Sequence, residues 1–299
     1  MRKGISQNKK IIIKLLILFV LLIIFIWTII QNSHIGVTSI DLHNKKIPEA
    51  FNGFKIAQLS DFHNAEFEKN NSAITESLKT QQPDIIVITG DFVDSRNTNI
   101  NIAVSLIEKI TDIAPCYFVT GNHESRIGEK YDILEDELLK LGVTVLHNQS
   151  VSINRNGSSI SLAGVDDPDF AIKRNGTLSS DYSIISAETD AAGITDGYNI
   201  LLSHRPELFE AYTEKNIDLV LSGHAHGGQF RLPFIGGLYA PDQGLLPKYD
   251  GGIYQKDNTV MIVSRGIGNS LFPFRFNNPP EIIYIVLYNG DNEINQYQL

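Results

Sequence analysis

The stretch Asp84-Ile-Ile-Val-Ile-Thr-Gly-Asp-Phe-Val-Asp94 decides the fold of this 299-residue chain. Its apolar, largely β-branched half predicts a strand over Asp84–Thr89. The run ends at Gly90, and two carboxylates follow at Asp91 and Asp94. In open α/β sheets, the loops at the carboxyl ends of strands converge on one crevice where ligands bind. These carboxylates are therefore candidate site residues.

The same pattern of a short apolar run followed by a longer amphipathic stretch recurs along the chain and predicts an α/β fold. Further strands are predicted over Lys55–Leu59, Cys116–Thr120, Tyr198–Ser203, Asp218–Ser222, Thr259–Ser264 and Ile282–Leu287. Helices are predicted over Ser72–Gln81, Ile100–Ile113 and Glu129–Leu141. Three strands, Val143–Leu146, Val151–Asn154 and Ser159–Ala163, are expected to be antiparallel, with Asn156-Gly157 as a hairpin turn.

Five short polar motifs each begin where one of these strands ends. They are Asp61-Phe-His63, Gly90-Asp91-Phe-Val-Asp94, Gly121-Asn122-His123-Glu124, the single His204, and Gly223-His224-Ala-His226. The set offers carboxylate, imidazole and amide groups but no thiolate, which suits a pair of divalent ions such as Mn, Fe or Zn. Phosphate esters are the natural substrates of such a pair.

The order and content of these motifs resemble the calcineurin-like metallophosphoesterase superfamily, from about Phe51 to the C-terminus. The resemblance implies a metal-dependent phosphoric ester hydrolase with a four-layer α/β/β/α sandwich of two mixed sheets. Gly227-Gly228-Gln229 extends the last motif to GHxHGGQ. That extension is typical of a bacterial subgroup with membrane-anchored members and is similar to UDP-diacylglucosamine pyrophosphohydrolase-like phosphoesterases.

The resemblance also implies a role for each motif residue. Asp91 bridges two metal ions; Asp61, His63 and His226 complete one metal site, and Asn122, His204 and His224 complete the other. A hydroxide between the ions attacks phosphorus. His123 protonates the leaving group or stabilises phosphoryl charge, and Asp94 orients His123. Glu124 is expected to be a carboxylate at a helix N-terminus, with a place behind the metal ligands as the alternative. Substrate-binding residues stay unassigned.

The nearly continuous apolar run from Ile11 to Ile30 is long enough to cross a bilayer core of about 30 Å. Arg2, Lys3, Lys9 and Lys10 precede it, which predicts a cytoplasmic N-terminus. We therefore expect a cytoplasmic tail over 1–10, a transmembrane anchor over 11–30, a linker with an edge strand over 31–50 and an extracytoplasmic catalytic domain over 51–299. A cleaved signal peptide is the alternative, but no A-x-A-like site follows the run.

Charge and cysteine content exclude other classes of protein. The formal net charge is −9, and no basic stripe occurs outside the N-terminal tail, so we expect no nucleic-acid partner. Cys116 is the only cysteine, which excludes an intramolecular disulfide and a cysteine-based zinc site. His34, His43 and His147 lack motif context and are interpreted as ordinary histidines. The pair Asp166-Asp167 is interpreted as capping or turn residues, with a place behind the metal ligands as the alternative.

The favoured function is a membrane-anchored hydrolase of phosphate mono- or diesters, with a lipid-linked substrate suggested by the anchor. Phe272, Phe274 and Phe276 either face a lipid tail or cover the core, and Arg265 or Arg275 is a candidate for steering an anionic head group. A phosphodiesterase for soluble nucleotides or wall polymers is one alternative. A non-catalytic metal-binding scaffold is the other, and it is disfavoured because no motif residue is missing.

Overall fold

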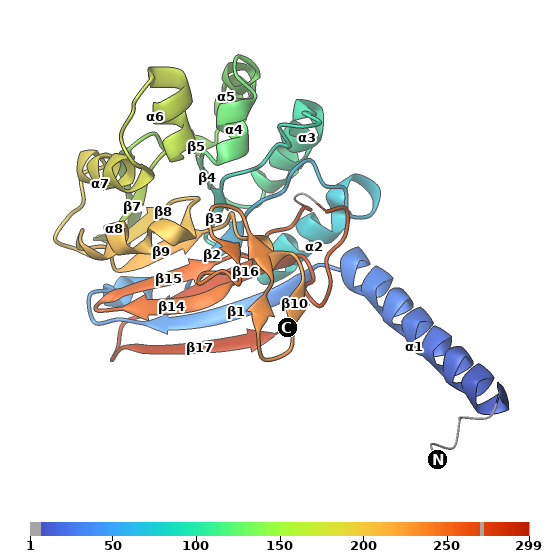
Figure 1. Ribbon diagram of the computed structural model, residues 1–299. Coiled ribbons are helices and arrows are strands. Elements are labelled where there is room, and N and C mark those ends of the chain that lie inside the picture. The colour runs from blue at the N-terminus through green and yellow to red at the C-terminus, as the bar shows by residue number, and fades with distance from the viewer. Residues whose placement is uncertain (1–6, 270–271, 299) are drawn as a thin grey trace.

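Two mixed β-sheets lie face to face in the computed structural model, which describes residues 7–269 and 272–298 (Figure 1). One apolar cluster fills the space between the sheets, and two further clusters join each sheet to the helices outside it. The predicted four-layer α/β/β/α architecture is confirmed. A long N-terminal helix projects away from these layers.

The first sheet has seven strands in the order β17-β1-β16-β2-β3-β4-β5. Their bounds are β1 Gly36–His43, β2 Phe54–Leu59, β3 Ile85–Thr89, β4 Cys116–Val119, β5 Thr144–Val145, β16 Glu281–Tyr288 and β17 Glu293–Gln298. Strands β2 to β5 are parallel to one another, and β16 runs antiparallel to β2. Helices α2 (Ser72–Gln81), α3 (Ile100–Ile110) and α5 (Lys130–Lys140) pack on the outer face, close to their predicted bounds.

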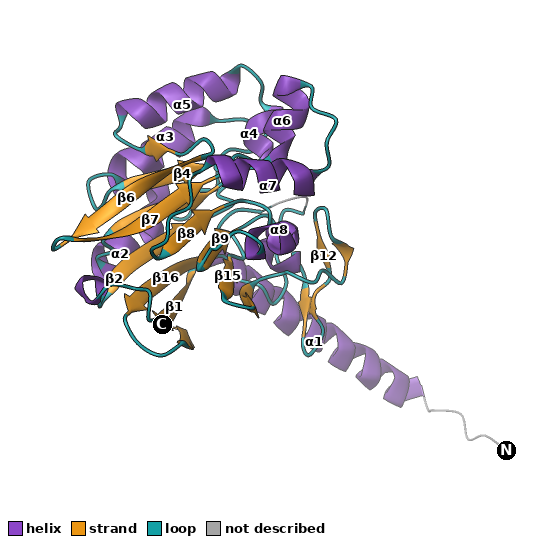
Figure 2. Ribbon diagram, turned by 90° about the vertical axis from the view of Figure 1, so that its left-hand side faces the viewer, coloured by secondary structure: helices purple, strands orange, loops and turns teal. Residues whose placement is uncertain are grey.

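The second sheet has six strands in the order β14-β15-β9-β8-β7-β6 (Figure 2). Their bounds are β6 Gln149–Arg155, β7 Ser158–Gly164, β8 Asn199–Leu202, β9 Leu219–Ser222, β14 Gly252–Lys256 and β15 Thr259–Val263. Helices α7 (Asp181–Ala191) and α8 (Phe209–Thr213) pack on its outer face. Strands β7, β8, β9 and β15 are parallel, so their carboxyl ends lie at one edge.

One predicted strand pairing is wrong. Strand β5 pairs in parallel with β4 in the first sheet, whereas only β6 and β7 form the antiparallel hairpin, in the second sheet. The chain changes sheets between β5 and β6, where Asn148 takes a left-handed conformation with φ +52°. The hairpin turn at Asn156-Gly157 is confirmed, with φ values of +48° and +80° that suit a type I′ turn.

The segment expected to be a linker contains a strand of the first sheet. Strand β1 pairs with β16 along its whole length, from Gly36 opposite Glu281 to His43 opposite Tyr288. The expectation of an edge strand is wrong, because β17 covers the other side of β1. Strand β17 escapes prediction since its polar sequence, Glu293-Ile-Asn-Gln-Tyr-Gln298, is largely exposed at the sheet edge.

Helix α1 (Gln7–Ser33) is apolar and has no buried residues. Its 27 residues span about 40 Å, which exceeds a bilayer core of about 30 Å. The basic residues Arg2 and Lys3 lie outside the described residues. The last turn of α1 contacts the domain: the Asn32 side chain donates to the Arg275 carbonyl oxygen (2.7 Å) and accepts from the Arg275 backbone N–H (2.8 Å).

Candidate metal centre

Five strand ends, three from the first sheet and two from the second, bring the candidate ligands together. Asp61 and His63 follow β2, Asp91 follows β3, Asn122 follows β4, His204 follows β8, and His224 and His226 follow β9. Strands β2, β3 and β4 are parallel neighbours, and so are β8 and β9. All seven side chains are buried.

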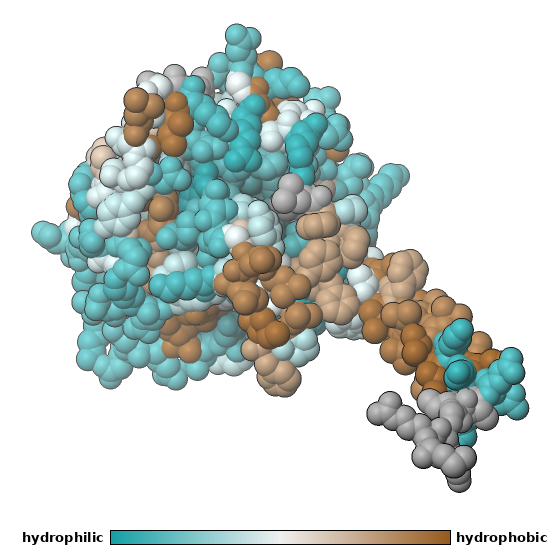
Figure 3. All heavy atoms as spheres, in the orientation of Figure 1, coloured by the Kyte–Doolittle hydropathy of each residue, from teal (hydrophilic) through white to brown (hydrophobic). Residues whose placement is uncertain are grey.

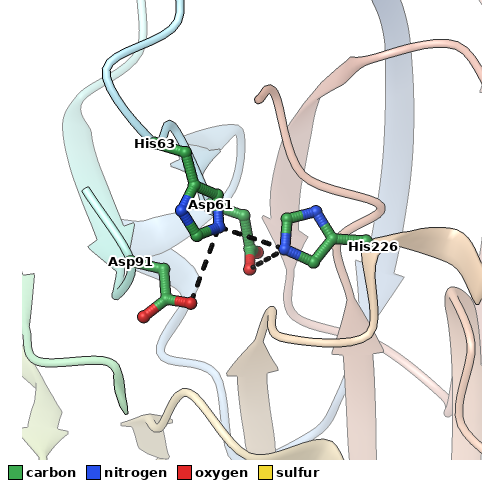
Figure 4. Close-up of side chains that lie close together, drawn as sticks. All are labelled: Asp61, His63, Asp91 and His226. Atoms are coloured by element: carbon green, nitrogen blue, oxygen red, sulfur yellow. Dashed lines mark hydrogen bonds and ion pairs between the residues drawn. The ribbon is translucent and has the colours of Figure 1, made fainter. Parts of the chain in front are cut away.

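The first cluster consists of Asp61, His63, Asp91 and His226, shown in Figure 4. His63 Nε2 and His226 Nε2 lie 3.1 Å apart. His226 Nε2 is 3.2 Å from Asp61 Oδ1, and His63 Nε2 is 3.6 Å from Asp91 Oδ2. These nitrogen and oxygen atoms point at a common centre from three different loops.

The second cluster shares Asp91 with the first. His204 Nε2 lies 3.3 Å from Asp91 Oδ2 and 3.1 Å from His224 Nδ1. The side-chain oxygen of Asn122 faces the same atoms, 3.0 Å from His224 Nδ1 and 3.3 Å from both His204 Nε2 and Asp91 Oδ2. Asp91 Oδ1 accepts the backbone N–H of His123 (2.8 Å), which leaves Oδ2 as the oxygen that faces both clusters.

Hydrogen bonds behind the imidazoles determine which ring nitrogen faces the centre with a lone pair. His204 Nδ1 lies 2.7 Å from the Thr89 carbonyl oxygen, which only accepts, so Nδ1 carries the hydrogen. His224 Nε2 lies 2.9 Å from Asp242 Oδ2 and donates to it. Outer partners of this kind fix the tautomer of metal-binding histidines. The opposite nitrogens, His204 Nε2 and His224 Nδ1, are the ones aimed inward.

The inward-facing atoms of the second cluster are all hydrogen-bond acceptors, which repel one another unless a cation or proton lies among them. Turning the Asn122 amide would place its oxygen 2.6 and 2.9 Å from the Arg126 guanidinium nitrogens and its nitrogen toward the cluster. A divalent ion selects the orientation with oxygen inward, because amide oxygen is a ligand and amide nitrogen is not. The donor set therefore fits a metal ion.

The charges of the cluster point to competition between protons and cations. Burial favours the neutral form of Asp91, yet the surrounding imidazoles, His204 first, hold its pKa well below the usual value. Burial also opposes a charge on His204, but Asp91 raises the pKa of that imidazole to about 10. Burial lowers the pKa of His63 to about 3, so this ring is neutral. Cation binding to such ligands releases protons.

Five of the candidate ligands have a left-handed backbone, which is uncommon for residues other than glycine. They are Asp61, His63, Asp91, His224 and His226, with φ between +48° and +66°. Such strain collects at functional sites when the surrounding structure maintains it. Gly121 permits the close approach of two of these loops, because a Cβ there would lie 2.3 Å from Asp91 Oδ1.

His123 lies beside both clusters, and its Nδ1 is contacted by a backbone group as well as by the predicted Asp94. The Ser95 backbone N–H donates to His123 Nδ1 (2.9 Å), so the neutral ring carries its hydrogen on Nε2, which lies 4.0 Å from Asp91 Oδ2. Burial lowers the pKa of His123. The nearest Asp94 oxygen is 3.6 Å from Nδ1, and the Asp94 carboxylate accepts from Arg96 Nε (3.0 Å) and Nη2 (2.8 Å).

Glu124 has a larger structural task than a carboxylate at a helix N-terminus. Its fully buried carboxylate accepts the backbone N–H groups of Asp91 (2.8 Å), Phe92 (2.8 Å), Val93 (3.1 Å) and Gly121 (2.8 Å). It thereby joins the loops after β3 and β4. Burial raises the pKa of Glu124 to about 7, and the charge of Asp91 acts in the same direction.

A network behind His224 was missed by sequence reasoning. Asp242 accepts from His224 and also from Nη1 of the buried Arg205, whose Nε and Nη2 donate to Asp167 (2.5 and 2.9 Å). Asp167 is also the N-cap of α6 (Pro168–Asn175), accepting from the Asp169 N–H. Both interpretations of Asp167 therefore apply. Asp242 lies in a loop whose sequence carries no motif. The sequence signal for this network is Arg205, a cation directly after His204 that needs a carboxylate partner.

The two arginines expected to steer a head group are engaged within the protein. Arg275 is fully buried, and its guanidinium donates to the carbonyl oxygens of Arg265 (2.5 Å) and Gly268. Arg265 forms an ion pair with the buried Glu281 (2.5 Å). Their roles are structural here, because neither guanidinium is presented to the surface as a free charge.

His147 is not an ordinary surface histidine. Its Nδ1 lies 2.8 Å from Asp166 Oδ1, and its Nε2 lies 2.8 Å from Glu135 Oε1. Although burial works in the opposite direction, the hydrogen bond and charge of Asp166, followed by those of Glu135, raise the pKa of His147 to about 9. Because the pKa is higher in the folded state, this stabilisation is complete below about pH 6.5 and disappears as the pH rises to 9.

We expect His147→Gln to lower the free energy of unfolding by about 1–2 kcal/mol at pH 6 and by much less at pH 10. The value is reduced from the full pKa shift because the side chain is 35% exposed. Urea unfolding at the two pH values measures the difference. His43→Gln is a matched control in the first sheet, where the His43 ring stacks on Tyr288. An equal loss at both pH values for His147→Gln would contradict the ion-pair interpretation.

Comparison with known proteins agrees with this geometry. The family model described as "Calcineurin-like phosphoesterase" matches residues 54–228. The chain is 32% identical over 270 residues to the uncharacterized metallophosphoesterase YkuE of Bacillus subtilis, covering 86% of this chain and 87% of that protein. It is 28% identical over 239 residues to the phosphodiesterase YaeI of Escherichia coli, covering 78% and 82%.

A transmembrane protein with metallophosphoesterase domain from Bos taurus is 30% identical over 266 residues, which cover 84% of this chain and 57% of that protein. The family match includes more than half of the chain and all seven candidate ligands. The family and the clustered ligands also agree on metal dependence. The chain belongs to the calcineurin-like phosphoesterase family and is a metal-dependent phosphoric ester hydrolase.

Proposed function

We propose that this protein is a membrane-anchored two-metal phosphoesterase that hydrolyses phosphate mono- or diesters, with lipid-linked phosphates as its favoured substrates. One observation carries the two-metal part: Asp91 Oδ2 faces both clusters, 3.6 Å from His63 Nε2 and 3.3 Å from His204 Nε2. A carboxylate oxygen between two groups of nitrogen and oxygen ligands is the arrangement that holds two cations about 3.5–4 Å apart.

The seven candidate ligands are proposed to hold the two ions in the predicted sets. Asp61, His63, Asp91 and His226 form one set, and Asp91, Asn122, His204 and His224 form the other. When bound, two divalent ions supply Lewis acidity for the attack of water on phosphorus. Imidazole, carboxylate and amide donors suit Mn, Fe or Zn.

His123 and Arg126 are proposed to contact the substrate. Both line a cavity of about 350 Å³ above the clusters, together with Arg96, Tyr239 and Asp242. The Nε2 hydrogen of His123 is placed to donate a hydrogen bond to the leaving oxygen or to a phosphoryl oxygen, and transfer of a proton to the leaving oxygen requires the imidazolium form of this ring. With the Asn122 oxygen turned inward, the Arg126 guanidinium loses that acceptor, and a phosphoryl oxygen is the chemically matched replacement.

The membrane part of the proposal depends on α1. Its length and composition, and the name of the Bos taurus relative, support a single span. The basic residues before Ile11 support a cytoplasmic N-terminus and an extracytoplasmic domain. Protease added to intact protoplasts should then degrade the domain beyond Ser33. Complete protection until the cells are lysed would reject this orientation.

A phosphodiesterase acting on soluble nucleotides or wall polymers is the second candidate, and the resemblance to the E. coli phosphodiesterase supports its diester part. The scaffold alternative has no support from the site, since each of the seven candidate ligand positions carries the residue type that the motifs predict. We would assay the purified full-length protein in detergent with Mn, Fe or Zn, against chromogenic mono- and diesters and lipid phosphates. Hydrolysis that requires metal and exceeds that of the His123→Gln protein supports the proposal, whereas metal binding without turnover of any ester would reject it.

A further inference from the structure

An apolar groove of about 700 Å³ lies between α1 and the catalytic domain. One wall is the C-terminal half of α1, including Leu21, Phe25 and Ile29. The other wall is formed by Phe230, Phe274 and Phe276. These side chains are aliphatic or aromatic. Thr28, Asn32 and Ser33 add polar groups toward the end of α1, and no charged residue lines the groove among the described residues. Such a surface binds an apolar ligand rather than a soluble ion.

The aromatic wall is built from two loops: Phe230 lies in the loop that follows the last metal motif, and Phe274 and Phe276 lie in the loop between β15 and β16. Phe230 comes four residues after His226, and its ring lies 5.2 Å from that of Phe272 and 5.4 Å from that of Phe274, between ring centroids. The Gln229 side chain donates to the carbonyl oxygens of Phe272 (3.2 Å) and Phe274 (2.8 Å). The wall is thus held in place, although the Phe274 side chain is 46% exposed.

A single residue connects this wall to the candidate metal centre. The backbone of Arg275 is bonded to Asn32 at the end of α1, and its guanidinium lies 3.4 Å from His226 Nδ1. On the other side, the ring of Trp27 meets that of Phe276 edge-on at 5.8 Å. The groove therefore has a fixed position relative to α1 and to the metal centre.

The depth of the groove in a bilayer follows from the position of its lining on α1. Leu21 precedes the end of the helix at Ser33 by twelve residues, or about 18 Å of helical rise. If residues 11–30 span the membrane, Leu21 lies near the bilayer centre, and the stretch from Leu21 to Ile30, about 14 Å of helical rise, lies within the hydrocarbon of one leaflet. Water is a poor occupant there, because the lining offers few polar groups to bind it.

Neighbouring loops extend the same apolar surface. Phe234 and Ile235, 108% and 59% exposed, lie in the turn between β10 (Arg231–Leu232) and β11 (Gly236–Gly237). Figure 3 shows apolar side chains gathered on the face of the domain beside α1. Exposed apolar patches of this kind mark contact surfaces.

We propose that the groove between α1 and the Phe230, Phe274 and Phe276 wall holds an acyl chain of a phospholipid, drawn from the leaflet that surrounds the C-terminal half of α1. The inference deepens the proposed function and rests on its membrane part. It places the metal centre beside the head-group region of that leaflet, where lipid phosphates lie. The acyl chain binds by apolar contact, so phospholipids with head groups of different charge fit the same groove.

Intrinsic fluorescence tests this proposal because Trp27 is the only tryptophan. The full-length Trp27→Phe protein with Phe230→Trp, in nanodiscs of phosphatidylcholine with brominated acyl chains, should lose at least half of its emission relative to unbrominated nanodiscs. Bromine quenches only near contact, so the loss reports a chain in the groove. Phe274→Trp in the same background should behave alike. Leu178→Trp, at a side chain 101% exposed on the domain, is the control and should be unaffected.

If the two wall variants fold, by circular dichroism, but are quenched by aqueous acrylamide and not by brominated chains, the acyl-chain site is rejected. If one variant misfolds, the other still decides the test. Phe274→Trp is the variant expected to fold more readily, because the Phe274 side chain is already half exposed. The readout needs no metal or substrate. An active enzyme without quenching therefore rejects the groove alone, while quenching in an enzyme inactive on every ester rejects the proposed catalysis alone.

Discussion

The Asp91→Asn protein is expected to lose both metal ions and at least on the order of 10³ of its hydrolytic rate, because several kcal/mol of Lewis-acid stabilisation disappears. Asp91 Oδ2 faces both clusters, so the substitution removes one negative charge from two sites at once. The asparagine side chain is of similar size, and any loss reflects charge more than packing. Metal content by atomic emission and the rate on a chromogenic ester are measured together.

His123→Gln is the matched control for this prediction, since His123 lies beside the clusters and is assigned to neither. We expect it to retain both ions and to lose about 10² to 10⁴ in rate, the usual contribution of a general acid. Retention of two ions and normal turnover by Asp91→Asn would overturn the bridging assignment. Loss of an ion by His123→Gln would instead make that imidazole a ligand.

Glu124→Ala is expected to lower the free energy of unfolding by roughly 4 kcal/mol or more. The carboxylate accepts four backbone N–H groups in a fully buried position, and each buried donor left without an acceptor costs about 1–3 kcal/mol. Glu124→Gln should be less severe, because one side-chain oxygen remains to accept.

Urea unfolding of the metal-free protein measures this effect without a contribution from bound ions. Glu129→Ala, at an exposed glutamate five residues along the chain, serves as the control and should change the free energy by less than about 0.5 kcal/mol. A Glu124→Ala protein within 1 kcal/mol of the wild type would show that the four N–H groups find water or other acceptors after the substitution.

The sequence predicted the interior of the fold well, because buried strands have uninterrupted apolar patterns. Strands β2, β3 and β9 begin and end within one residue of the predicted bounds, and each carries its motif at the carboxyl end. Strands β1 and β17 were misplaced or missed, because their polar faces resemble a linker and a tail. Parallel pairing of β1 with β16 joins residues about 245 positions apart, which no local pattern encodes.

The motifs predicted which side chains would gather at the site, and the structure brings those seven together. The residues that hold them in place were not predicted. Asp242 and Arg205 act on His224 through contacts that exist only in the folded chain. The backbone N–H of Ser95, which bonds to His123, is invisible to any pattern of side chains. Sequence reasoning recovers residues whose identity matters, whereas backbone groups and loop residues are placed by tertiary structure.

The short connection between α1 and β1 limits where this enzyme can work. Only His34 and Ile35 separate the helix from a strand that is paired on both sides, and two residues extend by at most about 7 Å. A flexible tether of fifty residues would instead let a domain range over roughly 40 Å. If α1 is anchored, the catalytic pocket keeps a nearly constant height and orientation above the bilayer, so a lipid-linked substrate would reach it by lateral diffusion in the membrane and a soluble one by approach from the water.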